Sequence, residues 1–152
     1  MRLLKTEITL KFIVMGAGER EQEFRKASEG LYVSFIGRLP YAKMCGVLSA
    51  CDIAVNPIMP GAAQSIINKH ADFAASGIPV INTQESVEYR GLIDKFSMGF
   101  NCNNPSEIAD KLSLLVVDEN LRIRMGQNAR RCAEILFDRR TSYSKIVEAL
   151  LR

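Results

Sequence analysis

The chain has 152 residues, of which 47% are hydrophobic and 24% charged, and its formal net charge is +3. This length and composition predict one globular domain with a sizeable core, and they exclude a disordered segment and a bilayer-spanning helix. The charge is mild and the sequence contains no Trp. Nucleic-acid binders have a denser basic stripe with exposed aromatic residues, so we expect no nucleic-acid partner.

We expect a cytoplasmic protein with reduced thiols and no metal centre. Residues 1–12 are too polar for a secretory signal. The single histidine is His70, and no two cysteines have C-x-x-C spacing, so the pattern of a zinc site is absent from the sequence. Reduced thiols are the ordinary state in the cytosol. The cysteines are Cys45, Cys51, Cys102 and Cys132.

Short apolar runs alternate with polar or amphipathic segments, which predicts alternating strands and helices. The strands are apolar on both faces, as in a parallel sheet covered by helices on both sides, so the predicted fold class is α/β with a Rossmann-like sheet. The predicted elements are strand 11–15, helix 19–28, strand 31–36, helix 41–50, strand 52–55, helix 66–76, strand 78–82, helix 85–94, strand 98–102, and helices 106–117, 119–137 and 141–151.

The helix after the third strand carries the most informative pattern. Ser65 is a suitable N-cap and Gly77 a suitable C′ residue. The N-terminus of this helix would lie at the carboxyl edge of the sheet, where open α/β sheets bind ligands. Its free N–H groups and dipole would suit a phosphate, Lys69 adds a positive charge, and Asp72 could accept hydrogen bonds from ribose hydroxyls. One polar stripe runs along it, formed by Ser65, Asn68, Lys69, Asp72 and Ser76. The periodicity by itself favours an ordinary amphipathic helix slightly over this functional interpretation.

Two other loops would lie at the same edge. Gly16-Ala17-Gly18 follows the first strand, and glycines allow a backbone to approach an anion closely. A plain turn is an equally good interpretation, because the third glycine of a dinucleotide fingerprint is replaced by Glu21. Arg38 follows the second strand, where it could stack on a base or contact a phosphate, or could simply be solvated.

Two further features favour structural roles. Six arginines lie between positions 122 and 140, and they could face anionic lipid, but neighbouring acids favour a solvated helix face. His70 falls on the largely apolar side of its helix, so we expect a packed residue and no catalytic base.

Five segments follow one another in a recognisable order. They are KFIVMGAGE, VSFIGRLPYAKMCGVLSACDIAVNP, QSIINKHADFAASGIPVINT, GFNCNNPSEIADKL and ENLRIRMGQNARRCAEILF. In this order they resemble the C-terminal domain of glycosyltransferase family 4, whose members have the GT-B fold. The resemblance implies a retaining transferase domain that binds a nucleotide-diphosphate sugar, with UDP as the expected carrier and without a metal ion.

The resemblance also assigns roles to residues. The family's pair of glutamates, separated by seven residues, falls on Gln64 and Asp72. Asp72 keeps the carboxylate implied to bind ribose, whereas Gln64, at the catalytic position beside the donor sugar, keeps only an amide. The diphosphate would meet the backbone of Ser65, Ile66, Ile67 and Asn68 together with Lys69, the base would meet Ile36, Gly37, Arg38 and Leu39, and Gly16 and Gly18 would line the cleft floor.

The resemblance further implies that the chain is one half of an enzyme, without its N-terminal acceptor domain and the first strand of this domain. The Ser65-to-Lys69 segment followed by Asp72-Phe73 resembles a subgroup that builds bacterial surface polysaccharides such as O-antigen, capsule and lipopolysaccharide. The implied acceptor is a lipid-linked glycan at the inner face of the cell membrane, with peripheral membrane contact as an option. Alternatives are a non-catalytic nucleotide- or protein-binding Rossmann-like module and a GT-B sugar-nucleotide epimerase.

Overall fold

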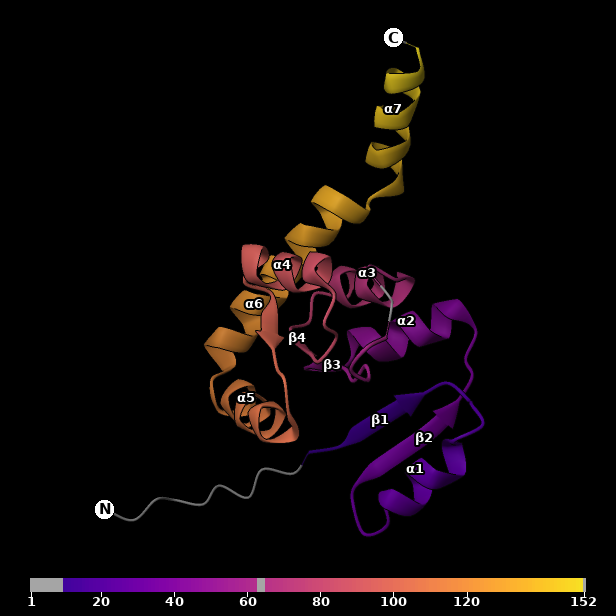
Figure 1. Cartoon of the computed structure of the whole chain (residues 1–152), viewed down its shortest axis with the longest axis vertical. Helices are drawn as coiled ribbons and strands as arrows, with labels where there is room; N and C mark the ends of the chain where they lie inside the picture. Colours follow the sequence, from indigo (N-terminus) through magenta and orange to yellow (C-terminus); the bar gives the residue numbers. More distant parts are fainter. Residues whose placement is uncertain (1–9, 63–64, 152) are drawn as a thin grey trace, which may run out of the picture. The chain divides into compact units, whose positions relative to one another are not determined.

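The computed structural model describes residues 10–62 and 65–151. The chain forms two compact units, Met1–Gly46 and Val47–Arg152, and each is described by itself. The elements, which can be followed in Figure 1, are β1 (Phe12–Met15), α1 (Glu21–Ala27), β2 (Val33–Gly37), α2 (Tyr41–Ser49), β3 (Ala54–Asn56), α3 (Asn68–Ala75), β4 (Val80–Asn82), α4 (Val87–Phe96), β5 (Gly99–Asn101), α5 (Pro105–Val117), α6 (Glu119–Cys132), a π-helical turn η1 (Ala133–Phe137) and α7 (Arg139–Leu150).

The first unit contains a parallel pair of strands, β1 and β2, with Phe12 opposite Val33. The register shifts after Val14, so that Met15 lies opposite Gly37. The helix α1 between them is exposed and has acidic residues in its first turn and basic residues in its last, as the helix dipole favours.

The second unit contains a three-stranded parallel sheet in the order β3-β4-β5. Its strands are short, and all three residues of β4 are buried. Ile81 points into a core built with α5 and α6, which includes Cys102, Leu115 and Met125. The next residue, Asn82, therefore faces the other side of the sheet, since successive side chains of a strand alternate. On that side Asn101 of β5 hydrogen-bonds α4. Helices thus cover both faces of this sheet, and the predicted α/β class with parallel strands is confirmed.

Several predicted helix boundaries differ from the observed ones, and one difference concerns the candidate site. The helix expected from residue 66, with Ser65 as N-cap, begins at Asn68, and its N-cap is Ile67 in an extended conformation. The predicted C-terminus is confirmed, because Gly77 follows the C-cap Ser76 with a left-handed φ of 67°. The reason for the late start lies in contacts made by His70 and Gln84, described below.

None of the helices in the described residues is long and apolar enough to cross a membrane.

Candidate functional site

A ladder of asparagine side chains lies at the carboxyl edge of the second sheet. Asn56, Asn82 and Asn101 end the three strands and face one another in register. The amide nitrogen of Asn56 donates to Asn82 Oδ1 over 2.7 Å, and Asn82 Nδ2 donates to Asn101 Oδ1 over 3.0 Å. Asn101 Nδ2 then donates to Asp94 of α4 over 2.9 Å. This chain of bonds fixes the edge from which the ligand-binding loops of an open α/β sheet emerge.

His70 closes the β3 end of this ladder. It is 1% exposed and stacks on the ring of Tyr89, and its Nδ1 accepts a hydrogen bond from the backbone N–H of Ile67 over 3.2 Å. Since Nδ1 accepts, a neutral ring carries its proton on Nε2, which lies 3.3 Å from Asn56 Nδ2. The side chain of Gln84 also hydrogen-bonds the ring. Burial, reinforced by the charge of Lys69, lowers the pKa of His70 to about 4, although the Gln84 hydrogen bond opposes this. His70 is a packed, neutral residue, as its position on the apolar side of the helix predicts.

Gln84 ties the same region to the sheet edge. Its side chain is fully buried, and its Nε2 donates to the carbonyl oxygen of Ser65 over 2.6 Å. Its backbone N–H donates to Asn82 Oδ1, and its Oε1 accepts from Asn56 Nδ2. Ser65 is therefore held outside the helix, which explains why it does not serve as the N-cap.

The predicted diphosphate segment forms one continuous stretch at this edge. Ser65, Ile66 and Asn68 are exposed, and Lys69 and Asp72 are half-buried on the first two turns of α3. Burial lowers the pKa of Lys69. The N–H of Ile67 is already bonded to His70, which leaves the amides of Ser65, Ile66 and Asn68 as the candidates for a phosphate.

The predicted catalytic position, Gln64, lies outside the described residues.

The predicted base-binding and cleft-floor residues belong to the first unit. Gly16 N–H donates to the Gly37 carbonyl over 2.8 Å, so these two glycines lie side by side at the carboxyl ends of β1 and β2. Both have left-handed backbone φ, 125° and 69°, which requires glycine. Gly18 and Arg38 are exposed, Ile36 is 38% exposed and Leu39 is half-buried. The positive φ thus explains why Gly16 and Gly37 are glycines. An added Cβ at either position would meet open space, which leaves room for a ligand.

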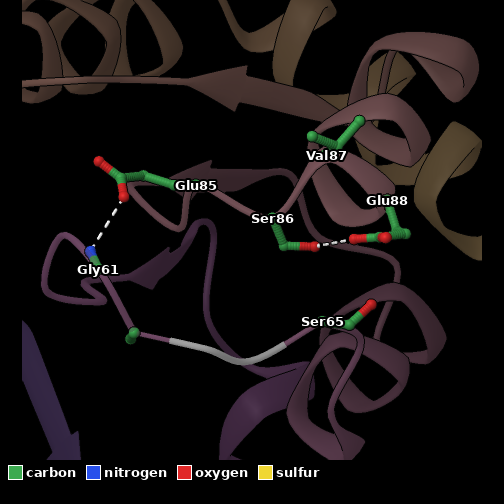
Figure 2. A pocket seen from close by; sticks show the side chains of 7 residues that line it. Gly61, Ser65, Glu85, Ser86, Val87 and Glu88 are labelled. Atoms are coloured by element: carbon green, nitrogen blue, oxygen red, sulfur yellow. Dashed lines mark hydrogen bonds between the residues drawn. The ribbon is translucent and has the colours of Figure 1, made fainter.

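An open pocket of about 420 Å³ lies beside the start of the diphosphate segment. Figure 2 shows Glu85 pointing to the backbone of Gly61, whose N–H it accepts over 2.9 Å. Ser86 donates to Glu88 over 2.8 Å. The hydroxyl of Ser86, the backbone N–H of Glu88 and the hydroxyl of Ser65 all hydrogen-bond the Glu88 carboxylate and lower its pKa. The lining residues are Gly61, Ala62, Ser65, Glu85, Ser86, Val87 and Glu88.

This pocket is anionic, because it is lined by the carboxylates of Glu85 and Glu88. An anionic wall disfavours a phosphate and suits the hydroxyl groups of a neutral ligand. The candidate phosphate-binding segment and the pocket are therefore distinct parts of one candidate site, joined at Ser65.

Three of the six arginines between positions 122 and 140 contact other groups of the protein. Arg122 donates to the Leu115 carbonyl, and Arg130 donates to the Ala75 carbonyl and pairs with Glu134. Arg140 pairs with Asp138 over 3.6 Å. These contacts favour the predicted solvated helix face over a free cationic surface.

The thiols and the possible metal ligands of the described residues form no second chemical site. All four cysteines are free, and burial raises the pKa of the Cys102 and Cys132 thiols, which makes them poor nucleophiles. Within residues 10–62 and 65–151, no group of three or more histidine, cysteine or acidic side chains could hold a metal ion.

The sequence contained an overlooked pattern for the ladder and the pocket. All three strands of the second sheet end in asparagine, at positions 56, 82 and 101. Buried polar residues repeated at the same end of neighbouring parallel strands indicate a side-chain network. The acids of Gln84-Glu85-Ser86-Val87-Glu88 follow β4 at the carboxyl edge, where ligands bind.

The family model described as "Glycosyl transferases group 1" matches residues 1–118. No curated protein matches the chain.

Several solved structures share the fold. HepE of Anabaena in complex with UDP shares 22% identity with a TM-score of 0.76, over 93% of this chain and 40% of that one. WaaG, a glycosyltransferase involved in lipopolysaccharide biosynthesis, shares 20% identity with a TM-score of 0.67, over 82% of this chain and 34% of that one. The C-terminal domain of LpcC from Francisella tularensis shares 22% identity with a TM-score of 0.59, over 77% of this chain and 60% of that one. These likenesses establish the fold, and the chain spans less than two thirds of the length of each of these structures.

Proposed function

This chain belongs to the group 1 glycosyl transferases, and we propose that it is the donor-binding domain of a retaining enzyme that uses a nucleotide-diphosphate sugar. The observation that carries the proposal is the Ser65–Ile67 segment, extended at Ile67, which leads into α3 at the carboxyl edge of the sheet. A helix N-terminus at this edge offers N–H groups and a positive dipole to a phosphate.

The chemistry follows from the charge of the leaving group. When the sugar leaves, negative charge grows on the diphosphate, and amides of the segment together with the Lys69 ammonium stabilise it without a metal ion. Asp72, one turn further along α3, accepts hydrogen bonds from the ribose hydroxyls. The anionic pocket beside Ser65 receives the sugar, whose hydroxyls donate to Glu85 and Glu88. Gln64 lies next to Ser65 in the sequence and is proposed to contact the sugar through its amide.

UDP is the proposed carrier. HepE, which shares the fold, was solved in complexes with UDP and with UDP-glucose, and this supports UDP as the first nucleotide to test. The base is proposed to contact Ile36, Gly37, Arg38 and Leu39, with Gly16 and Gly18 at the cleft floor.

The proposed reaction is hexosyl transfer to a lipid-linked glycan in the synthesis of a bacterial surface polysaccharide, at the inner face of the cell membrane. The shared fold of WaaG supports this setting. We expect the 152-residue chain to bind the donor but to transfer no sugar, because acceptor binding is proposed to need a further domain. Turnover of UDP-sugars by the purified chain, measured by release of UDP, would contradict that expectation.

Calorimetry with UDP tests the proposal directly. If Asp72 holds the ribose, Asp72→Ala leaves two hydroxyls unpaired and weakens UDP binding by on the order of 1–3 kcal/mol. The matched control is Asp110→Ala, which removes an exposed acid from α5. Equal affinity of the wild-type chain and Asp72→Ala would refute the ribose role, and a wild-type chain that binds neither UDP nor GDP would refute donor binding.

A further inference from the structure

Two buried side chains hold the Ser65–Ile67 segment, one at each end. Gln84 Nε2 donates to the carbonyl oxygen of Ser65 over 2.6 Å. At the other end, the N–H of Ile67 donates to His70 Nδ1 over 3.2 Å, and the Ile67 carbonyl accepts from the backbone N–H of His70 over 2.9 Å. Only Ile66 lies between these two attachments, so the path of the segment is fixed on both sides.

Both side chains are themselves fixed by the interior. His70 is 1% exposed, and its ring lies against Tyr89. Gln84 is fully buried and bonded to Asn56 and Asn82 of the asparagine ladder. The segment is thus tied to the sheet edge through side chains that have little freedom to move.

The tie at Ile67 has the geometry of half a capping box. In that motif the third residue of a helix accepts a hydrogen bond from the N–H of the N-cap, usually with Glu or Gln. Here His70 is the third residue and supplies Nδ1 as the acceptor. The bond needs an unprotonated Nδ1, and burial of the ring maintains that state.

We propose that His70 and Gln84 are positioning residues that preorganise the Ser65–Ile67 segment to receive the diphosphate of the donor. The inference rests on the donor-binding function proposed above and adds two residues to it. In this proposal neither side chain contacts the diphosphate. They act because a segment already in its bound shape loses less conformational entropy when the diphosphate arrives.

A matched pair of variants at His70 tests the role of the acceptor. His70→Phe keeps a ring against Tyr89 but removes Nδ1, whereas His70→Gln restores an acceptor at the position where capping boxes use Gln. We expect His70→Phe to weaken UDP binding about tenfold in calorimetry, and His70→Gln to stay within about threefold of the wild type. Equal weakening by two folded variants would overturn the proposal, since loss of packing would then explain both.

Amide hydrogen exchange without nucleotide provides a second readout. In His70→Phe the amide of Ile67, which loses its acceptor, should exchange at least about tenfold faster, while the amides of Ile108–Leu115 in α5 keep their wild-type rates. A general loss of stability would accelerate both sets and would overturn the proposal.

Gln84→Met is an independent variant, which keeps the length of the side chain and removes its donor to Ser65. It should weaken UDP binding and accelerate exchange in the same segment, and it carries the test if His70→Phe does not fold. Wild-type affinity together with wild-type exchange in Gln84→Met would overturn the proposal. If the wild-type chain binds no UDP, the donor-binding function fails, while exchange in the variants still decides whether these residues order the segment.

Discussion

The imidazole ring of His70 lies flat on the phenol ring of Tyr89, with centroids 3.5 Å apart and planes inclined by 6°. Both residues are at most 1% exposed. The stack fixes the plane of the imidazole, and the plane decides where Nδ1 points. Since Nδ1 receives the N–H of Ile67, the aromatic contact between α3 and α4 sets the position of a backbone amide in the candidate site.

The state of this histidine gives a pH dependence of stability. The imidazole takes a proton at an ordinary pKa of 6.5 in the unfolded chain, but its pKa in the folded chain is about 4. Between these values the unfolded state binds more protons, so the His70 contribution is fully present above pH 6.5 and is lost as the pH falls toward 4. At pH 4.5 the loss amounts to about 2–3 kcal/mol.

Urea unfolding of the wild type and of His70→Gln at pH 7.5 and pH 4.5 measures this contribution. Carboxylates titrate in both proteins, so the informative quantity is the difference between their two pH dependences. The wild type should lose about 2–3 kcal/mol more than His70→Gln on acidification. Parallel pH profiles would show that His70 is not held neutral by the fold.

The asparagine ladder predicts a substitution that is conservative in shape and severe in effect. Asn56 is fully buried, and its amide donates to the oxygens of Asn82 and Gln84, so Asn56→Asp would place a carboxylate against two acceptors. An uncompensated buried charge costs about 3–5 kcal/mol. The wild-type Oδ1 of Asn56 finds no hydrogen-bond partner within the described part of the chain. His70 Nε2, 3.3 Å from Asn56 Nδ2, is a neighbouring donor that would offset only part of the new charge.

The cost of Asn56→Asp should depend on pH. Burial among acceptors raises the pKa of an aspartate, so its penalty grows as the pH rises and shrinks where the carboxyl is protonated and can donate. Asn56→Ala is the control, because it also breaks the ladder but introduces no charge. The free energies of unfolding of Asn56→Asp and Asn56→Ala should therefore lie closer together at pH 4.5 than at pH 7.5. A constant difference between the two would contradict the ladder orientation described above.

The outline of the fold could be predicted because it depends on local patterns. Apolar runs such as FIVM and PVIN, together with glycines at turns, mark the strands within a residue or two of β1 and β4. The left-handed Gly77 follows from the rule that helices end in glycine. These features need information only from residues close in sequence.

The start of α3 could not be predicted in this way. Ser65 has the right side chain for an N-cap, but its carbonyl is bonded to Gln84, which lies 19 residues away in the chain. Once Ser65 is held in the extended segment, the helix can begin only after Ile67, where His70 supplies the local acceptor. Local propensity is overruled by the tertiary hydrogen bond from Gln84, and the local bond to His70 then sets the new start of the helix. Neither residue belongs to a motif that the sequence emphasises.

A close helix contact was equally hidden in the sequence, and it provides the last prediction. Gly126 lies inside α6, where glycine lowers helix stability, yet its missing Cβ makes room for the turn after α3. A Cβ at this position would collide with the backbone carbonyl of Gly77 and approach the backbone of Ile78. The obstacle is main chain, which cannot rotate away as a side chain can. We therefore expect Gly126→Ala to destabilise the protein by about 1–3 kcal/mol through overpacking.

Gly91 is the matched control, because it also lies inside a helix, α4, but an added Cβ there meets open space. Gly91→Ala should stabilise the protein by up to about 1 kcal/mol, since alanine is the better helix former. Thermal and urea unfolding of the two variants should thus shift in opposite directions. If both variants were stabilised, α6 would not pack on the Gly77 turn as closely as the structure has it, and the late-starting α3 would lose its anchor at the C-terminal end.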